Sequence, residues 1–576
     1  MSQTDEGNRS TRWRCTRVAL GHEAPSLVLR GGRVFSVFTG ELMEGDVALC
    51  GPFIAGIGSF PEGPSVDVSG RILLPGFIDA HFHIESSLLA PASYAEAVII
   101  HGTTTVMEEP HELVNVVGPR GVDFFLAARE GLPLDLRIML PSSVPASPFE
   151  EAAGRMTGAD VARYLSREGV TGLGEVMDYD GVLDGGPIWD VIEAAESRVA
   201  DGHAPGLTGS ELNAYLAAGP RTDHETSARP LLAERMRLGM WLLAREGSAS
   251  RDLEQILPFL RRYGTSRTCL CTDDRHAATL VEEHHIDGMV ETLAAHGLEL
   301  REAISAGTSN PAGLYRLDDR GFIAPGMRAD LIAVEDPAAP HPDLVLSRGE
   351  IVAKGGRPTR PLPPTPPLES PPVRLEIKSA EQLVPRVSPG TRTVRAVRIT
   401  PRRLETQEEH VSVRAPNGRI IPDSDADLAY AAVLERHRGT GMVGTGLVVG
   451  TGLRKGALAS TVAHDAHHLI VLGRDGETML ALAQEIARAG GGIGVASESG
   501  FQVLPLPLAG LMTDRPAREV AQILRQLEAE AARLGVHLEA PFMALSFLAL
   551  SVIPVLRITP RGLLHVPSRK IVPVGL

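Results

Sequence analysis

The chain has 576 residues and a formal net charge of −15, with 43% hydrophobic and 22% charged residues. This balance is typical of globular proteins, and the acidic excess without a basic, aromatic-rich segment argues against nucleic acid as a partner. No apolar run is long enough to cross a bilayer and no secretory signal begins the chain, so we expect a cytoplasmic protein without membrane contact. The four cysteines are too few for a disulfide framework, and we expect Cys269 and Cys271 to be buried free thiols.

Lysine is nearly absent. Only four of the 56 basic residues are lysines, and the first of them is Lys354. Chemistry that requires a lysine amine is therefore excluded from the first 353 residues.

The elements follow one another in a recognisable order. Residues 1–25 are polar and are expected to form a flexible leader, and short β-type runs separated by glycine predict a small β domain over 26–72. From 73 to 324 short apolar runs alternate with helical stretches, which predicts an α/β unit with parallel strands. Strand-like sequence returns over 325–356, and we expect it to pair with 26–72. These two segments, on either side of the α/β unit, would then form one small β-sandwich domain.

The last third of the chain is predicted to be a separate domain. A proline cluster over 357–372 predicts a semi-rigid linker. Residues 373–576 then predict a C-terminal α/β domain with an amphipathic helix near Pro516–Leu534. The glycine-rich stretches Gly441–Gly456 and Gly490–Gly494 lack the dinucleotide-binding fingerprint, so we expect them to form turns.

Candidate metal ligands stand at the ends of the predicted strands. His81 and His83 follow an apolar run, and their spacing of two places both imidazoles on one side of a strand. Four further residues each follow a probable strand: Glu175, His203, His224 and Asp273. The spacing fits strands 1, 4, 5, 6 and 8 of a barrel whose eight units average about 31 residues. Imidazole and carboxylate ligands suit zinc, iron or manganese, so the pattern predicts a metal site.

The motifs resemble those of a known family. Leu74-Pro-Gly-Phe-Ile-Asp-Ala-His-Phe-His83 looks like the metal-binding opening of the amidohydrolase superfamily. A closer resemblance is to bacterial adenine deaminases, and it extends over almost the whole chain from about residue 26. It rests on these strings: His83–Ser87, Gly102–Val106, Pro110–Glu112, Asp201–Leu207, Leu212–Tyr215, Asp223–Glu225, Thr272–Arg275, Ala463–His467 and Pro541–Phe547.

The resemblance implies a (β/α)8 TIM-like metal-dependent hydrolase barrel that binds two divalent metal ions, with Mn²⁺ or Fe²⁺ favoured and Zn²⁺ as an alternative. Many two-metal members of the superfamily bridge their ions with a modified lysine, which this barrel lacks, and Glu175 stands where that ligand is expected. His81, His83 and Asp273 would then hold one metal, and His203 and His224 the other. The implied reaction is the deamination of adenine, a small-molecule purine, to hypoxanthine and ammonia. The family also suggests a homo-oligomer.

Roles follow for the remaining candidates. Asp273, beside the metal, is our choice for moving a proton from water to the leaving ammonia, whereas Asp274 is expected to face the opposite side of the strand. Glu112 and Glu225 are further catalytic candidates, although Glu225 could merely orient its neighbours. His111 and Asp274 are candidates for binding the purine, and the loop holding His111 and Glu112 has an ordinary structural role as its alternative.

The sequence leaves the role of one segment and the exact reaction open. The segment His464–His468 could line the barrel mouth or bind an extra ion, but a structural role is favoured. Glu109 replaces an expected aspartate and Ala204 an expected cysteine, which bears on substrate preference rather than on the metal site. A related dinuclear amidohydrolase acting on another aminopurine or a cyclic amide is the first alternative function. A catalytically silent metal-binding scaffold is the second.

Overall fold

Residues 3–19 form a helix, where the sequence predicted a flexible leader over 1–25. The computed structural model describes residues 3–421 and 427–576, and its first element is α1 (Gln3–Ala19). Cys15 and Val18, three positions apart, lie on one side of α1 and are buried against β4 (Asp46–Cys50) and β5 (Phe53–Gly58). Two apolar residues in a polar segment are a weak sequence signal for a helix.

We expect the contact between α1 and the small β domain to be measurable. Val18 is 1% exposed, so Val18→Ala should leave a small cavity and weaken the docking of α1 by about 1–2 kcal/mol. Amide hydrogen exchange should show faster exchange along α1. Trp13 is 63% exposed, so Trp13→Ala should change exchange little; equal effects of both substitutions would contradict this packing.

Strands from both flanks of the central unit share one sheet, as the sequence predicted. β7 (Ile72–Pro75) pairs parallel with β2 (Arg33–Phe35) and antiparallel with β16 (Leu331–Asp336). The sheet continues through β17 (Ala339–Ser347), β18 (Glu350–Lys354) and β19 (Arg357–Pro358). A second sheet contains β1 (Leu27–Arg30), β4, β5 and β6 (Ser65–Asp67), and an apolar core contains residues of both sheets.

Two predicted boundaries shift by a few residues. The apolar run before His81 divides into β7 and β8 (Phe77–Phe82), which belong to different sheets. Gly76 lies at the division, where a Cβ atom would be 2.4 Å from the Thr104 hydroxyl oxygen. β19 lies within the segment assigned to the linker, because it pairs with β18.

The parallel strands of the central unit place the functional residues. Five of them form a sheet in the order β12-β11-β10-β9-β8, and three form a sheet in the order β13-β14-β15. Their bounds are β9 (Thr103–Glu108), β10 (Asp135–Leu140), β11 (Val170–Val176), β12 (Val199–Gly202), β13 (Thr222–Asp223), β14 (Trp241–Arg245) and β15 (Thr268–Cys271). A parallel bridge between Phe82 and Asp273 joins the two sheets where β8 and β15 end.

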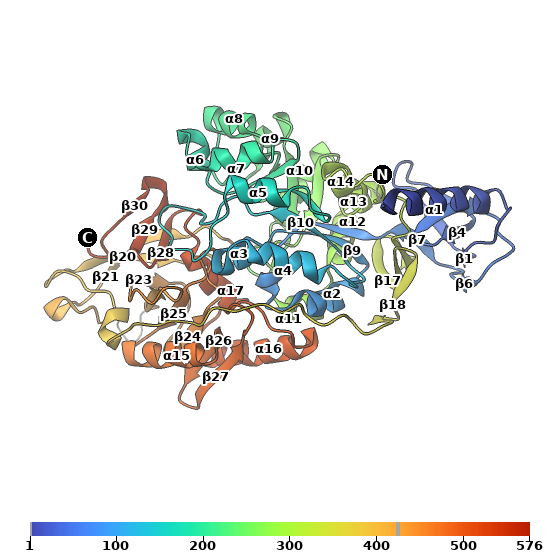
Figure 1. Ribbon diagram of the computed structural model, residues 1–576. Coiled ribbons are helices and arrows are strands. Elements are labelled where there is room, and N and C mark those ends of the chain that lie inside the picture. The colour runs from blue at the N-terminus through green and yellow to red at the C-terminus, as the bar shows by residue number, and fades with distance from the viewer. Residues whose placement is uncertain (1–2, 422–426) are drawn as a thin grey trace.

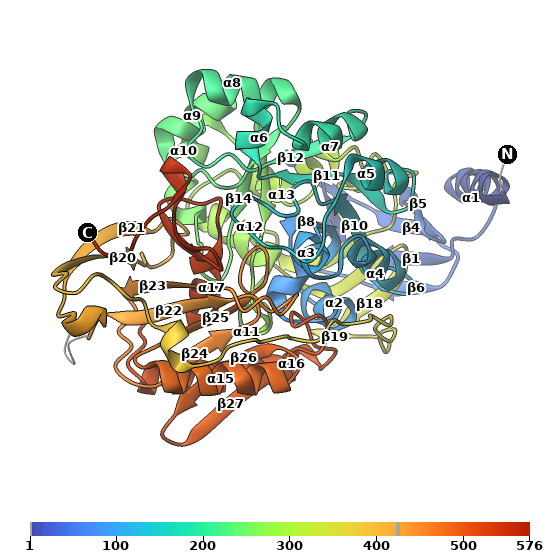
Figure 2. The same cartoon turned by 60° about the vertical axis from the view of Figure 1, so that its left-hand side comes forward.

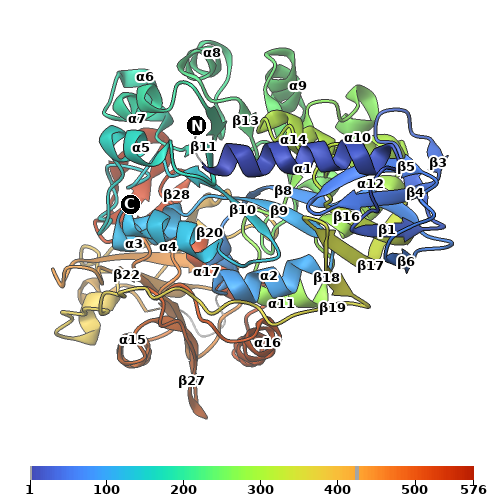
Figure 3. The ribbon, with the colours of Figure 1, turned by 45° about the vertical axis from the view of Figure 1, so that its right-hand side comes forward.

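Helices alternate with these strands, as the sequence predicted, and Figure 3 shows them around the strands. They include α2 (Pro91–Ile99), α3 (His111–Val117), α4 (Arg120–Ala128), α8 (Gly209–Ala218), α10 (Leu253–Tyr263), α11 (Ala277–Glu282) and α12 (Ile286–Ala295). Cys269 and Cys271 on β15 are buried free thiols, also as predicted. No helix in the ranges that the structure describes is long and apolar enough to span a membrane.

The C-terminal domain contains an eight-stranded sheet in the order β21-β20-β23-β22-β25-β24-β26-β27. Their bounds are β20 (Thr393–Arg398), β21 (Gln407–Ser412), β22 (Ala429–Leu434), β23 (Val443–Val449), β24 (Ala457–Ser460), β25 (Leu469–Gly473), β26 (Gly492–Ser497) and β27 (Gly500–Pro505). α15 (Gly476–Arg488) and α16 (Ala517–Arg533), both labelled beside the sheet in Figures 1 and 2, contact it on opposite faces. α15 packs with Ala457 and Ala459 of β24, whereas α16 shares a core with Leu458, and Figure 3 shows β27 between the two helices. α16 begins after Pro516, as predicted, and packs on α11 of the central unit.

The prediction that both glycine-rich stretches form turns is wrong. β23 runs through the first stretch and β26 begins within the second. Glycine is required in β23 by close packing, because a Cβ on Gly444 would lie 1.7 Å from the Thr559 carbonyl oxygen and one on Gly446 2.7 Å from the Ile558 side chain. Both partners belong to β28 (Leu556–Thr559), which packs across β23.

Candidate active site

Six residues predicted from the strand ends converge on one buried point. They are His81, His83, Glu175, His203, His224 and Asp273, and none is more than 4% exposed. Each lies in or directly after β8, β11, β12, β13 or β15. Neighbouring parallel strands bring their carboxyl ends to the same edge, so residues distant in the sequence meet there.

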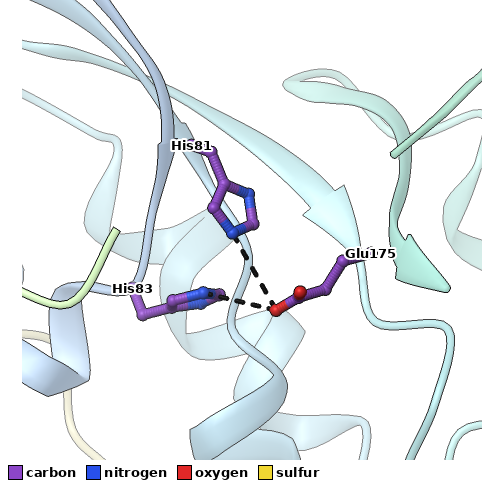
Figure 4. Close-up of side chains that lie close together, drawn as sticks. All are labelled: His81, His83 and Glu175. Atoms are coloured by element: carbon purple, nitrogen blue, oxygen red, sulfur yellow. Dashed lines mark ion pairs between the residues drawn. The ribbon is translucent and has the colours of Figure 1, made fainter. Parts of the chain in front are cut away.

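Glu175 lies between two pairs of histidines. Its Oε1 atom is 3.5 Å from His83 Nε2 and 3.9 Å from His81 Nε2, as Figure 4 shows. Its Oε2 atom is 2.8 Å from His203 Nδ1 and 3.1 Å from His224 Nε2. Each carboxylate oxygen therefore faces a different pair of imidazoles.

Asp273 completes the side of the site that holds His81 and His83. Its Oδ1 atom is 3.3 Å from His83 Nε2 and 3.7 Å from His81 Nε2. Its φ angle of 53° lies in the left-handed region, so the chain leaves the extended conformation at this residue. The alternation of a strand therefore does not continue to Asp274, which faces the site as well; the expectation that Asp274 points away is wrong.

The donor set suits a divalent cation. His81 is fully buried and neither of its ring nitrogens has a hydrogen-bond partner, and the same holds for Nδ1 of His224 and Nε2 of His203. The Nδ1 atom of His83 lies 2.9 Å from the Glu109 carbonyl oxygen, which orients the ring so that its Nε2 faces Glu175 and Asp273. Imidazole nitrogens and carboxylate oxygens grouped in this way could hold a divalent metal ion.

Arg245, at the end of β14, was missed by the sequence analysis. Its Nη1 atom donates to Asp273 Oδ2 at 2.9 Å and to Glu225 Oε1 at 2.5 Å. Burial raises the pKa of Glu225, but Arg245 and the neighbouring histidines outweigh it and bring that pKa to about 2. Glu225 is thus a fixed anion whose Oε1 is 3.4 Å from His224 Nε2, which suits orientation of that imidazole better than proton transfer.

A second buried cluster joins the central unit to the C-terminal domain. His464 Nε2 lies 3.0 Å from Glu112 Oε1, 3.2 Å from Asp274 Oδ1 and 3.1 Å from Ser86 Oγ. Burial opposes protonation of His464, but Asp274 and Glu112 outweigh it and hold its pKa well above the usual value. His464 therefore belongs to the site region. This differs from the sequence analysis, which favoured a structural role for the segment that contains it.

His111 lies between this cluster and Glu175. Its Nδ1 atom is 3.8 Å from Glu175 Oε1, and its Nε2 atom is 3.6 Å from Asp465 Oδ1 of the C-terminal domain. Glu109 Oε2 accepts a hydrogen bond from the Glu175 backbone NH at 2.7 Å, and burial together with the Glu175 charge raises the Glu109 pKa to about 8. A protonated Glu109 adds no negative charge beside Glu175. Ala204, the other departure from the expected pattern, is fully buried.

Comparisons with known proteins agree with this arrangement. Residues 72–354 match the amidohydrolase family, and residues 403–570 match the adenine deaminase C-terminal domain. Adenine deaminase 2 of Carboxydothermus hydrogenoformans is 40% identical over 564 residues, which cover 97% of this chain and 98% of that protein. The chain belongs to the adenine deaminase family. The adenine deaminase of Methanoregula boonei is 41% identical over 557 residues, covering 96% and 97% of the two chains. Among solved structures, a β-aspartyl dipeptidase from Fervidobacterium islandicum aligns with 59% of this chain and 98% of its own, at 17% identity and a TM-score of 0.45.

This member of the adenine deaminase family has a cavity of about 480 Å³ whose lining includes neighbours of Glu175 but none of the six candidate ligands. Loops after β10 and β11 line it on one side and include Ser142, whose hydroxyl donates to the Glu175 carbonyl oxygen, and Met177, two residues after Glu175. Val552 and Arg569 of the C-terminal domain line the other side. The C-terminal domain of this family member therefore shares a cavity with the loops that follow β10 and β11.

Proposed function

We propose that this protein hydrolyses adenine to hypoxanthine and ammonia. Near-full-length similarity to proteins named adenine deaminase supports the substrate. The observation that carries the chemistry is the position of Glu175, whose two oxygens each face one pair of histidines. A complete set of ligands argues against the catalytically silent scaffold, because a degenerate site usually loses ligands.

The eight parallel strands are proposed to form one closed (β/α)8 barrel. The bridge between Phe82 and Asp273 and the contact of β12 with β13 support closure at the two junctions of the sheets. In such a barrel the active site lies at the carboxyl ends of the strands, where the six candidate ligands stand.

We propose two divalent ions at these ligands, with Mn²⁺ or Fe²⁺ favoured and Zn²⁺ as the alternative. His81, His83 and Asp273 would hold one ion, His203 and His224 the other, and Glu175 both. Bound cations of this kind lower the pKa of water, so that hydroxide is available near neutral pH. No lysine precedes Lys354, which leaves a carboxylate such as Glu175 for the shared position.

The protein's own groups move the protons. In the proposed reaction the water oxygen bonds to C6 of adenine and the ring nitrogen N1 gains a proton. The C6–amino bond then breaks to release ammonia, and the C6 hydroxyl proton returns to the group that protonated N1, leaving the carbonyl of hypoxanthine. Asp273 accepts the water proton and delivers it to the leaving amino group, while Arg245 holds its second oxygen in place. His464 and Ser86 hold Glu112, which is proposed to supply the proton for N1, and His464 also holds Asp274, which is proposed to bind the purine together with His111.

The direct test is ammonia release by the purified, metal-loaded protein. Adenine should yield hypoxanthine and ammonia in equal amounts, measured by chromatography and an ammonia assay. Activity on another aminopurine or a cyclic amide without activity on adenine would favour the related amidohydrolase. Inactivity across the panel would favour the scaffold.

We expect His464→Ala to lower kcat by about 10–100-fold while the metal content stays unchanged, because His464 positions Glu112 and Asp274 but ligates no ion in this proposal. Steady-state kinetics and elemental analysis provide the two measurements. His410→Ala, at a 56% exposed side chain on β21, is the control and should be neutral. Loss of metal in His464→Ala would contradict this division of roles.

A place in purine salvage, a cytoplasmic location and a homo-oligomeric state also belong to this proposal. They rest on the sequence and the family resemblance. Light scattering coupled to size-exclusion chromatography tests the oligomeric state.

A further inference from the structure

Three histidines meet one carboxylate at the opposite edge of the parallel strands. His101 lies two residues before β9 begins, so it stands near the amino end of that strand, away from the candidate active site. His284 and Asp287 flank the start of α12, and His341 lies on β17 of the small β domain. α12 and β17 are in contact, and both are labelled in Figure 3.

One ring nitrogen of each imidazole lies near the same oxygen atom; His101 and His341 hydrogen-bond to it, and the His284 ring stacks on that of His341 with ring centroids 3.7 Å apart. Asp287 Oδ2 is 3.3 Å from Nδ1 of His101, 3.2 Å from Nδ1 of His284 and 2.9 Å from Nδ1 of His341. One carboxylate oxygen has two lone pairs, so hydrogen bonds satisfy only two of the three nitrogens well. The distances are close to the ligand–ligand separation of about 3.3 Å that a tetrahedral zinc ion with bonds of about 2.0–2.1 Å requires.

The groups around the cluster hold the ligands in orientation. Asp287 is fully buried and its Oδ1 atom accepts a hydrogen bond of 2.7 Å from the His285 backbone NH, so Oδ2 stays directed at the histidines. His341 Nε2 lies 3.1 Å from Glu291 Oε2, the carboxylate partner that a metal-binding imidazole commonly has on its other nitrogen. Gly288 allows His284 to approach α12, because a Cβ there would lie 2.5 Å from the His284 Cβ.

We propose that His101, His284, His341 and Asp287 form a structural site for Zn²⁺ or a similar transition-metal ion, separate from the catalytic centre. Three neutral nitrogens and one carboxylate oxygen are a ligand set that zinc accepts, and four protein ligands complete a tetrahedral structural site. Ligation requires the His284 ring to turn out of its stack with His341, for which its half-exposed position leaves room. The ion would join the segment before β9, the start of α12 and strand β17. Its binding would therefore fasten the small β domain to the central unit and stabilise the folded protein.

The test compares zinc binding among variants of the whole protein. After chelation, wild type, His284→Ala, His341→Ala and His296→Ala are dialysed to equilibrium against micromolar Zn²⁺ and analysed for bound zinc per chain. His296 is an exposed histidine at the end of α12 outside the cluster, so its variant is the matched control. Wild type and His296→Ala should bind one more zinc than the other two variants, and equal zinc in all four proteins would overturn the proposal.

Thermal unfolding provides a second readout that does not depend on catalysis. Zn²⁺ should raise the Tm of wild type and of His296→Ala by several degrees more than that of His284→Ala and His341→Ala. Because both readouts are differences among variants with the same catalytic ligands, they stand whether or not the protein deaminates adenine. His284 is 49% exposed, so its replacement by alanine should leave the fold intact, which circular dichroism verifies. A Tm shift of the same size in all four proteins would also overturn the proposal.

Discussion

Glu175→Ala should lose bound metal and deaminase activity together. Loss of a single hydrogen-bond donor to a transition state costs about 10²–10³-fold in rate, so loss of a ligand shared between two ions should lower kcat/KM by more than about 10³-fold. The physical reason is local: without Glu175, no carboxylate remains between the two pairs of imidazoles, and the charge that balances a cation pair is reduced to that of Asp273 and Glu225. Elemental analysis and steady-state kinetics measure the two losses.

Two further variants separate charge from shape. Glu175→Gln keeps the size of the side chain but removes the negative charge, so it should also bind less metal. Glu168→Ala replaces an exposed glutamate just before the same strand and should retain full metal content and activity. Full activity in Glu175→Ala, or loss of activity with two metals still bound, would rule out the shared-ligand assignment.

The metal-ligand candidates could be predicted because they depend on local rules. His81 and His83 share a face through the two-residue period of a strand, and the end of a strand in a parallel unit is where side chains meet. Glu175 follows from the same rule as a candidate ligand, and the family resemblance, together with the absence of lysine before Lys354, implies its shared position. For these residues the chain's own periodicity and composition carry the information, and the structure brings them together at one point.

The remaining parts of the site depend on contacts that no local pattern contains. His464 reaches Glu112 across 352 positions in the sequence, and only the docking of the C-terminal domain brings them together. Asp274 faces the site because Asp273 adopts a positive φ, which no residue type in that segment requires. Arg245 ends an ordinary apolar strand, and its role becomes visible only beside Asp273 and Glu225.

The difference between local patterns and tertiary contacts also explains which features of the fold were predicted wrongly. Glycine in a sequence usually signals a turn, but Gly444 and Gly446 lie within β23 because β28 crosses it too closely for a side chain. In α1 the two buried residues are outnumbered by polar ones, so the partner surface on β4 and β5 is needed to recognise the helix. In both cases tertiary packing decides what the local composition leaves open.

Asp273→Asn should lower kcat by about 10²–10⁴-fold, the usual contribution of general acid–base catalysis. Asparagine keeps the size of the side chain and one oxygen, but it cannot carry the water proton to the leaving ammonia. KM for adenine should change much less than kcat, because the proposed purine contacts are to other residues. Steady-state kinetics as a function of pH, with metal content measured in parallel, separates the loss of a proton carrier from the loss of an ion.

A substitution at Asp252 distinguishes proton transfer by Asp273 from simple neutralisation of the Arg245 charge. Asp252 also accepts a hydrogen bond from Arg245, with its Oδ2 atom 3.0 Å from Nε, but it faces none of the candidate metal ligands. If Asp273 only neutralised Arg245, Asp252→Asn would cost a similar factor in kcat. We expect Asp252→Asn to retain most of the activity, because Glu225 and Asp273 still hold the guanidinium and the proton carrier remains. Equal losses in both variants would assign Asp273 an electrostatic role and leave the proton transfer to another group.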